Sequence, residues 1–382
     1  MAQGKKEIMK SFIHTFCIKT KIDNDEYRKI NAVYQIEYYS NMHKHLLNTY
    51  KDRGLRIEIF QCKEIEVRMD KDNCWNKLNL IFTTYKLLHN GNRIGEVTEK
   101  HEIEEASKKV IMLLVDIYKK SGVDLLKRAS INRVDVTKDI ITPSDAYTKE
   151  IIRIAKETEL PYGYKMWIPE ENDKLIHPQW KVENAVFVNN HSQELEFKLY
   201  DKKADLEINK ECTDFLENKS WLRIELTMKK KMLKKQGYVK SDIITVEIVK
   251  DMLQAITVDA DYLLINYIGG ILSPVDNLSK KILTKYIKYE CGSKVRRAEK
   301  MIKYIECMKN GKIDSYGSAK AVSNIETEFE ILGISPIYSK VECPYIPSVE
   351  KLIGGQEINY RLLNIAKRYN ERRGRYDLIY WR

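Results

Sequence analysis

The stretch ELEFKLYDK, residues 194–202, alternates polar and apolar side chains from Glu194 to Tyr200. In a β-strand, successive side chains point to opposite faces of the sheet. We therefore predict a strand whose apolar face consists of Leu195, Phe197 and Leu199. The opposite face then carries the polar members, which are Glu194, Glu196, Lys198, Tyr200 and Lys202.

Two further stretches share this design, INRVDVTKD at 131–139 and WLRIELTM at 221–228. Their polar faces hold two similar sets, Arg133, Asp135 and Thr137 in the first and Arg223, Glu225 and Thr227 in the second. We expect the three strands to be neighbours in one mostly antiparallel sheet with helices on its apolar face. Each strand taken alone is better explained as an ordinary half-solvated strand, so only their combined chemistry argues for a site.

The rest of the chain predicts an α+β fold. Strand patterns also occur near 9–19, 55–69, 76–87 and 183–190, and helical patterns occur at 102–121 and 143–157. Loop signals occupy 88–95 and 159–182, and no internal repeat is visible. After about residue 240 the strand patterns fade, and helices are expected at 241–268, 276–310, 318–332 and 347–372. We thus predict an α+β domain over 1–238, followed by a mostly helical DNA-binding or accessory region over 239–382.

Composition favours a polyanionic partner. The 382 residues include 66 Lys or Arg against 55 Asp or Glu, a formal net charge of +11. DNA or RNA would match that surplus, although a Lys-rich surface from an AT-rich genome would also produce it. The seven cysteines are scattered without a CxxC pair, which argues against a disulfide framework and a zinc ribbon. No apolar run is long enough for a membrane span, so a cytoplasmic protein without a membrane partner is expected.

The polar faces suggest phosphodiester chemistry. Asp135 and Glu225 could hold a divalent cation such as Mg²⁺ or Mn²⁺ through oxygen ligands. Tyr200 could attack a phosphate, although a phenol with a pKa of about 10 is a weak nucleophile at neutral pH. A bound metal and nearby cations would lower that pKa. The candidate phosphate-binding cations are Arg133, Lys198, Lys202, Lys203 and Arg223.

At these residues the chain resembles the phage and plasmid replication initiators typified by the gene II protein of filamentous phages. The resemblance lies in three segments in the same order. They are Arg133-Val134-Asp135, then Lys198-Leu199-Tyr200-Asp201-Lys202-Lys203-Ala204-Asp205-Leu206, then Leu222-Arg223-Ile224-Glu225 followed by the basic run from Lys231 to Gly237. Staphylococcal-type plasmid replication proteins share the pattern more loosely. Asp201 has no acidic counterpart in that family.

The resemblance implies a palm-like nickase core and rolling-circle replication initiation. Tyr200 would become covalently attached to the 5′ end of nicked origin DNA and leave a free 3′-OH primer, with Lys202 and Lys203 as assisting cations. Asp135 and Glu225 would lie in the metal-dependent site, and Lys234 and Lys235 would contact DNA. The implied partners are origin DNA of a plasmid, phage or mobile element, and a host helicase and polymerase.

Several alternatives stay open. His43 and His45 have the gap of a nickase metal motif, but Lys44 stands where an apolar residue is needed. No P-loop is present, so an ATPase or helicase activity is not expected. Residues 318–340 could form a helix-turn-helix around Gly333, and the basic tail at 367–376 could follow a DNA backbone. The chain could also be a non-catalytic DNA-binding initiator or repressor, which a buried, apolar-packed Tyr200 would favour, or a protein whose sheet is only a scaffold.

Overall fold

The structure is a computed structural model. It describes residues 10–35, 37–40, 45–50, 54–60, 76–89, 97–167, 184–208, 213, 219–240, 243–269, 271–272, 275–309, 312–340 and 342–354. Several sequence-based expectations lie outside these ranges. They are the strand pattern beyond residue 60, most of the loops at 88–95 and 159–182, His43, the helix beyond residue 354 and the basic tail.

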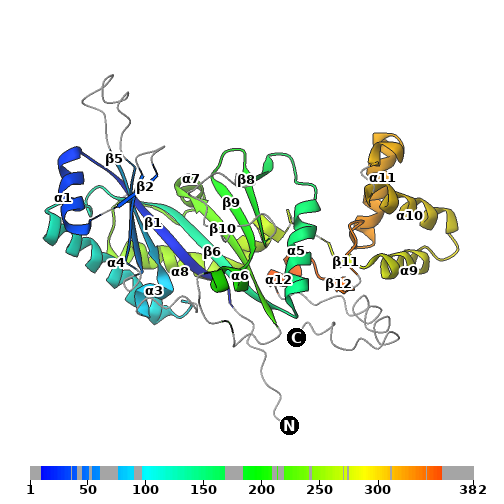
Figure 1. The fold of residues 1–382 in the computed structure, drawn as a ribbon, viewed down its shortest axis with the longest axis horizontal. Coiled ribbons are helices and arrows are strands. Elements are labelled where there is room, and N and C mark those ends of the chain that lie inside the picture. The colour runs from blue at the N-terminus through cyan, green and yellow to red at the C-terminus, as the bar shows by residue number, and fades with distance from the viewer. Residues whose placement is uncertain are drawn as a thin grey trace, which may run out of the picture.

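A ten-stranded antiparallel sheet dominates the molecule (Figure 1). Its order is β2 (Glu37–Ser40), β3 (His45–Tyr50), β4 (Leu55–Phe60), β5 (Asn76–Thr83), β1 (Phe12–Ile22), β6 (Ser130–Thr142), β10 (Ser220–Lys229), β9 (Leu195–Asp201), β8 (Ala185–Asn190) and β7 (Tyr164–Trp167). The three strands recognised from their alternation are β6, β10 and β9, and they are consecutive neighbours in this sheet. The prediction of a shared antiparallel sheet is therefore confirmed.

Four long helices cover the apolar face of the sheet. They are α1 (Asn24–Tyr34), α4 (Lys100–Ser121), α5 (Asp145–Glu157) and α8 (Val246–Leu264). Apolar residues of these helices join the inward residues of the strands in one continuous core, which includes Val110, Ile151, Phe197 and Leu253. The predicted helices at 102–121 and 143–157 are confirmed on that face.

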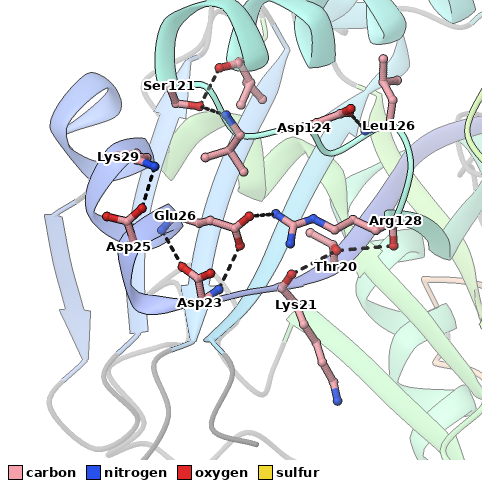
Figure 2. Close-up of polar contacts among 12 residues, drawn as sticks. Thr20, Lys21, Asp23, Asp25, Glu26, Lys29, Ser121, Asp124, Leu126 and Arg128 are labelled. Carbon is pink, nitrogen blue, oxygen red and sulfur yellow. Dashed lines mark hydrogen bonds and ion pairs between the residues drawn. The ribbon is translucent and has the colours of Figure 1, made fainter. Parts of the chain in front are cut away.

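Helix α1 shows why such elements begin where they do (Figure 2). The Asp23 carboxylate accepts the backbone N–H of Glu26, and the Glu26 side chain accepts the N–H of Asp23. Two donors that the helix cannot satisfy internally are thereby satisfied. Arg128, just before β6, pairs with Glu26 and joins this helix start to the central sheet.

The sheet contains a topological repeat that the sequence does not reveal. The order β1-α1-β2-β3-β4-β5-α4 recurs as β6-α5-β7-β8-β9-β10-α8, with short helices α3 (Thr84–Leu88), α6 (Lys202–Ile208) and α7 (Lys230–Lys235) added. In each half the first strand pairs with the last, and β1 and β6 join the halves antiparallel at the centre. The sheet is thus two copies of one pattern related by a pseudo-twofold axis.

The C-terminal region is mostly helical, as expected. It contains α9 (Lys280–Cys291), α10 (Val295–Lys309), α11 (Ala319–Ile331) and α12 (Val349–Gly354), with a two-stranded sheet of β11 (Asn277–Leu278) and β12 (Tyr345–Ile346). Helices α9, α10 and α11 share a core of their own and lie beyond α5 at one end of the molecule (Figure 1). Helix α12 instead packs on α8 and the main core. No helix among the described residues has the length and apolar character to cross a bilayer.

Two local expectations are wrong. The strand predicted at 76–87 ends at Thr83, and α3 begins at Thr84. The single helix expected at 276–310 is two helices, because Gly292 takes a positive φ of 51° between α9 and α10. The helix expected at 318–332 is confirmed as α11, and the open alternative of a helix-turn-helix over 318–340 is not met, since Gly333, at φ 62°, is followed by no second helix up to Lys340.

Candidate functional site

The strand register brings three predicted site residues together on the polar face of the sheet. Arg223 on β10 stands opposite Tyr200 on β9 and opposite Asp139 on β6. Glu225, two residues along β10, stands opposite Lys198. Because residues two apart on a strand share a face, Tyr200, Arg223 and Glu225 form one group.

Tyr200 is buried, with 6% of its surface exposed. Its ring packs with Ala185 and Phe187 of β8, a contact that the non-catalytic alternative anticipated. Its hydroxyl, however, donates a 2.8 Å hydrogen bond to Oε1 of Glu225. A phenol directed at a carboxylate is the arrangement of a nucleophile beside a proton acceptor.

The pKa of Tyr200 is raised well above its ordinary value. Burial is the main cause, and the negative charge of Glu225 adds to it, whereas Arg223 opposes the shift. The sequence-based expectation that Lys198 and Lys202 favour the phenolate is not met here. Lys198 faces Glu225 with Nζ 3.7 Å from Oε2, and Lys202 pairs with Asp205. Tyr200 is therefore a protonated phenol whose proton points at Glu225.

Arg223 is held by a carboxylate that sequence reasoning missed. Its Nε and one terminal nitrogen each donate 2.6 Å bonds to Asp139, and the two side chains are 1% and 2% exposed. Burial opposes the charged form of Arg223, but Asp139 and Tyr200 raise its pKa well above the ordinary value. The other terminal nitrogen is buried and has no hydrogen-bond partner among the described residues. One donor of a fixed guanidinium is thus left over beside Tyr200.

Asp135 is fully engaged by its neighbours. Its carboxylate accepts the hydroxyl protons of Thr15 and Thr227, and a terminal nitrogen of Arg133 lies 3.3 Å away. Burial alone would raise the pKa of Asp135, but Arg133, Lys198 and the two hydroxyls lower it below the ordinary value. The carboxylate is therefore ionised and already satisfied.

The carboxylates described on this face do not form a metal site in which every ligand comes from the protein. Asp135 stands opposite Thr227, so it is a diagonal neighbour of Glu225 across β6 and β10. Diagonal neighbours have Cα atoms about 7–8 Å apart. Within the described ranges, no group of three His, Cys, Asp or Glu residues is close enough to hold a metal ion.

The two lysines that follow Tyr200 do not continue the strand. The expectation that Lys202 lies on the strand face is wrong, because β9 ends at Asp201 and Lys202 begins α6. Asp201 accepts the N–H of Ala204 at the start of this helix, which gives it a structural role. Lys203 pairs with Asp145 of α5, 3.1 Å away.

The predicted DNA contacts Lys234 and Lys235 lie elsewhere. Both are exposed on α7, which follows the end of β10 opposite to Arg223. The structure therefore does not bring them to Tyr200.

A histidine that no motif marked lies near the group. His14 on β1 stacks edge-on against Phe12, with ring centroids 6.2 Å apart. Burial and then the charges of Arg223 and Lys202 lower its pKa well below the ordinary value, so it is neutral. Asp139, by contrast, could have been found, because it continues the alternate polar positions after Arg133, Asp135 and Thr137.

Ion pairs cover most of the polar face. Five carboxylates on the six central strands each have a cation from the same face, and the pairs are Arg56–Glu58, Arg133–Asp135, Arg223–Asp139, Lys198–Glu225 and Lys229–Glu196. Their separations run from 2.5 Å for the last pair to 3.7 Å for the pair before it.

No family model and no curated protein matches the chain. Among solved structures, a rolling circle replication initiator protein from Geobacillus stearothermophilus is similar at 11% identity and a TM-score of 0.29, covering 68% of this chain and 85% of that one. The TBP of Methanococcus jannaschii is similar at 11% identity and a TM-score of 0.26, covering 64% of this chain and 99% of that one. At these scores neither likeness carries an argument about function.

Proposed function

We propose that the chain is a rolling-circle replication initiator, a DNA nickase that uses Tyr200 as its nucleophile. The observation that carries the proposal is the 2.8 Å hydrogen bond from the Tyr200 hydroxyl to Glu225. It stands on a sheet face that also holds a buried arginine and several lysines. The resemblance of the three strand motifs to the gene II-type initiators agrees with it.

The proposed step exchanges one phosphoester for another. The Tyr200 oxygen attacks the scissile phosphorus while its proton passes to Glu225. The bond from phosphorus to the 3′ oxygen breaks, and that oxygen takes up a proton to become a free 3′-OH. The products are a 5′-phosphotyrosyl link and a primer end, whose extension requires a polymerase and a helicase from the host.

Arg223 would stabilise the charge that grows on the phosphate. Asp139 fixes the guanidinium with two bonds, so little reorganisation is needed when the phosphate arrives. Because the remaining terminal nitrogen is buried, Arg223 would act on the phosphate through its positive charge. Lys198 adds positive charge to the same surface, with Arg133 further along it, and Lys202 adds charge from the start of α6.

The proposal keeps the expected Mg²⁺ or Mn²⁺, with Glu225 in place of the pair Asp135 and Glu225 as its protein ligand. Mg²⁺ commonly uses one or two carboxylates and completes its shell with substrate phosphates and water. Glu225 is the carboxylate beside Tyr200, whereas Asp135 is already bound by two hydroxyls and Arg133. A bound cation would supply charge neutralisation at the phosphate.

We further propose that the helical region recognises origin DNA. Helices α9 and α10, with the turn between them, carry ten Lys or Arg against three Glu over residues 280–309. Such an excess suits contacts to a phosphate backbone. The exposed Lys234 and Lys235 on α7 would add to non-specific DNA affinity.

The burial of Tyr200 favours one second candidate, a non-catalytic DNA-binding initiator or repressor. In that case the ring packing against Ala185 and Phe187 is purely structural. The sheet face would then bind DNA without cleaving it.

Incubation with supercoiled DNA of the element that encodes the chain separates the two functions. With Mg²⁺ or Mn²⁺, the enzyme is expected to relax the DNA and to give a protein–DNA adduct on a denaturing gel. Addition of EDTA should abolish both products. DNA that is bound but never nicked with either metal would favour the non-catalytic initiator.

A further inference from the structure

Within the described part of the six central strands, three lysines on the polar face have no acidic partner. Lys19 and Lys21 lie on β1 and Lys77 lies on β5, all in the N-terminal half of the sheet. The five carboxylates of the central strands are each matched with another cation. On the described part of the six central strands, the uncompensated charge of this face is therefore concentrated on these three residues.

The strand register places these positive charges close together, which destabilises the folded protein when no anion is bound. Lys21 and Lys77 stand directly opposite each other across β1 and β5, and like charges in that position are destabilising. Lys19 is diagonal to Lys77 on the same face. Burial lowers the pKa of Lys19, and the positive charges of Lys77 and Lys229 lower it further.

Acids close to Lys21 in the chain do not relieve the repulsion. Asp23 and Glu26 are occupied by the capping box of α1, and Asp25 pairs with Lys29 at 2.6 Å. In Figure 2 the Lys21 side chain extends away from all of them. The nearest acids thus leave the lysine charge available to an external anion.

We propose that Lys19, Lys21 and Lys77 form a binding track for the phosphate backbone of single-stranded DNA. The inference rests on the proposed nickase function, because it assigns the track to a strand that continues from Tyr200. Each phosphate would relieve the repulsion between the lysines while forming a charge-assisted contact.

The positions of the three lysines and of Tyr200 allow one DNA strand to contact both. The lysines and Tyr200 lie on the same face, with β6 and β10 between β1 and β9. Three strand spacings and about eight residues along the strands place them roughly 30 Å apart. A segment of single-stranded DNA several nucleotides long covers that distance. Site sizes of about 4–16 nucleotides are typical of domains that bind single-stranded DNA.

The test measures binding of the full chain to a fluorescent 30-nucleotide oligo-dT over a range of salt concentrations. The variant Lys19→Gln/Lys21→Gln/Lys77→Gln should bind about tenfold or more weakly, because three phosphate contacts are lost. Its slope of log affinity against log salt should become shallower by about 2, since each single-strand contact contributes about 0.7. The matched control is Lys100→Gln/Lys119→Gln/Lys149→Gln, which removes the same charge from exposed positions on α4 and α5.

The outcomes separate this inference from the proposed function. Unchanged oligo-dT affinity in the first variant, or an equal loss in the control, would overturn the track. An equal loss of affinity for a 30-base-pair duplex would overturn its assignment to single strands. If wild type forms no covalent adduct but the first variant alone loses oligo-dT affinity, the nickase function fails and the lysines remain a single-strand binding surface. Thermal unfolding of each variant checks that it is folded.

Discussion

At the scale of single residues, the site is a phenol, a carboxylate and a guanidinium held by buried partners. Tyr200 donates to Glu225, and Asp139 holds Arg223 through two hydrogen bonds. These contacts fix the orientation of the three side chains within the folded protein. In the proposed reaction, the high pKa of the phenol means that removal of its proton would accompany the attack, and Glu225 is placed to accept that proton.

The pair of Asp139 and Arg223 should be costly to break. Asp139→Asn keeps the shape but leaves a buried guanidinium without its counter-charge, so unfolding should become easier by about 3–5 kcal/mol. Asp145→Asn is the matched control, because Asp145 is 52% exposed in its pair with Lys203, and its loss should cost less than about 1 kcal/mol. Urea unfolding measures both. Equal stability of the two variants would show that the buried pair is not held as described.

The sequence predicted part of this site, and the missing part has a physical reason. Alternation placed Tyr200, Arg223 and Glu225 on polar faces, because a strand has a fixed period of two. Alternation does not reveal register, and register decides that Tyr200 meets Glu225 while Asp135 is bound by Thr15 and Thr227. It also could not reveal His14, which reaches the site only through the pairing of β1 with β6.

At the scale of elements, the Glu150 side chain links the helical region to α5. Glu150 of α5 accepts two bonds from Arg153 and the backbone N–H of Lys340, while Arg153 donates to the carbonyl of Tyr338. Glu150 is buried, so these bonds are shielded from water. The segment that follows α11 is thereby anchored to α5.

Glu150→Ala should loosen that segment. We expect amide hydrogen exchange at residues 334–340 to accelerate by roughly tenfold or more, because the local opening free energy falls. Glu157→Ala is the matched control, since Glu157 pairs with Arg153 and is half exposed. Exchange measured by mass spectrometry should distinguish them. Unchanged protection in Glu150→Ala would mean that other contacts hold the segment.

Element types were predicted better than element ends. The period of 3.6 in α4 and α5 and the period of two in β6, β9 and β10 each identified the element. The break at Gly292 and the early end of β5 at Thr83 depend on backbone conformation and on tertiary contacts. A hydrophobic pattern carries little information about either.

At the scale of the whole molecule, the sheet is a pseudo-symmetric platform with two different halves. The polar face of the second half contains Tyr200 and four cations paired with carboxylates, whereas that of the first half contains the three unmatched lysines. The common topology was invisible in the sequence because a topological repeat requires only the same order of elements. It does not require similar side chains.

Buried thiols should make the folded state sensitive to high pH. Burial raises the pKa of Cys17 to about 12, and that of Cys343 likewise to about 12, from a reference value of 9.0. Above pH 9 the unfolded chain loses these protons while the folded chain keeps them. The free energy of unfolding therefore falls as pH rises from about 9 towards 12.

Urea unfolding in the presence of reductant, at pH 8 and at pH 10.5, tests this linkage. We expect a stability loss of about 1–2 kcal/mol for each buried thiol at the higher pH. The loss should be smaller in Cys17→Ala than in wild type. A free energy of unfolding that is flat over this interval would contradict the burial of these thiols.

The central claim is tested most directly by mapping the residue that carries the DNA. After reaction with origin DNA, nuclease and trypsin digestion should leave a nucleotide on the peptide of residues 199–202, LYDK, whose single tyrosine is Tyr200. Tyr200→Phe should remain folded, with a loss of about 1–3 kcal/mol for one hydrogen bond to a charged group, and should form no adduct. A nucleotide found on any other peptide, or an adduct formed by Tyr200→Phe, would contradict the account.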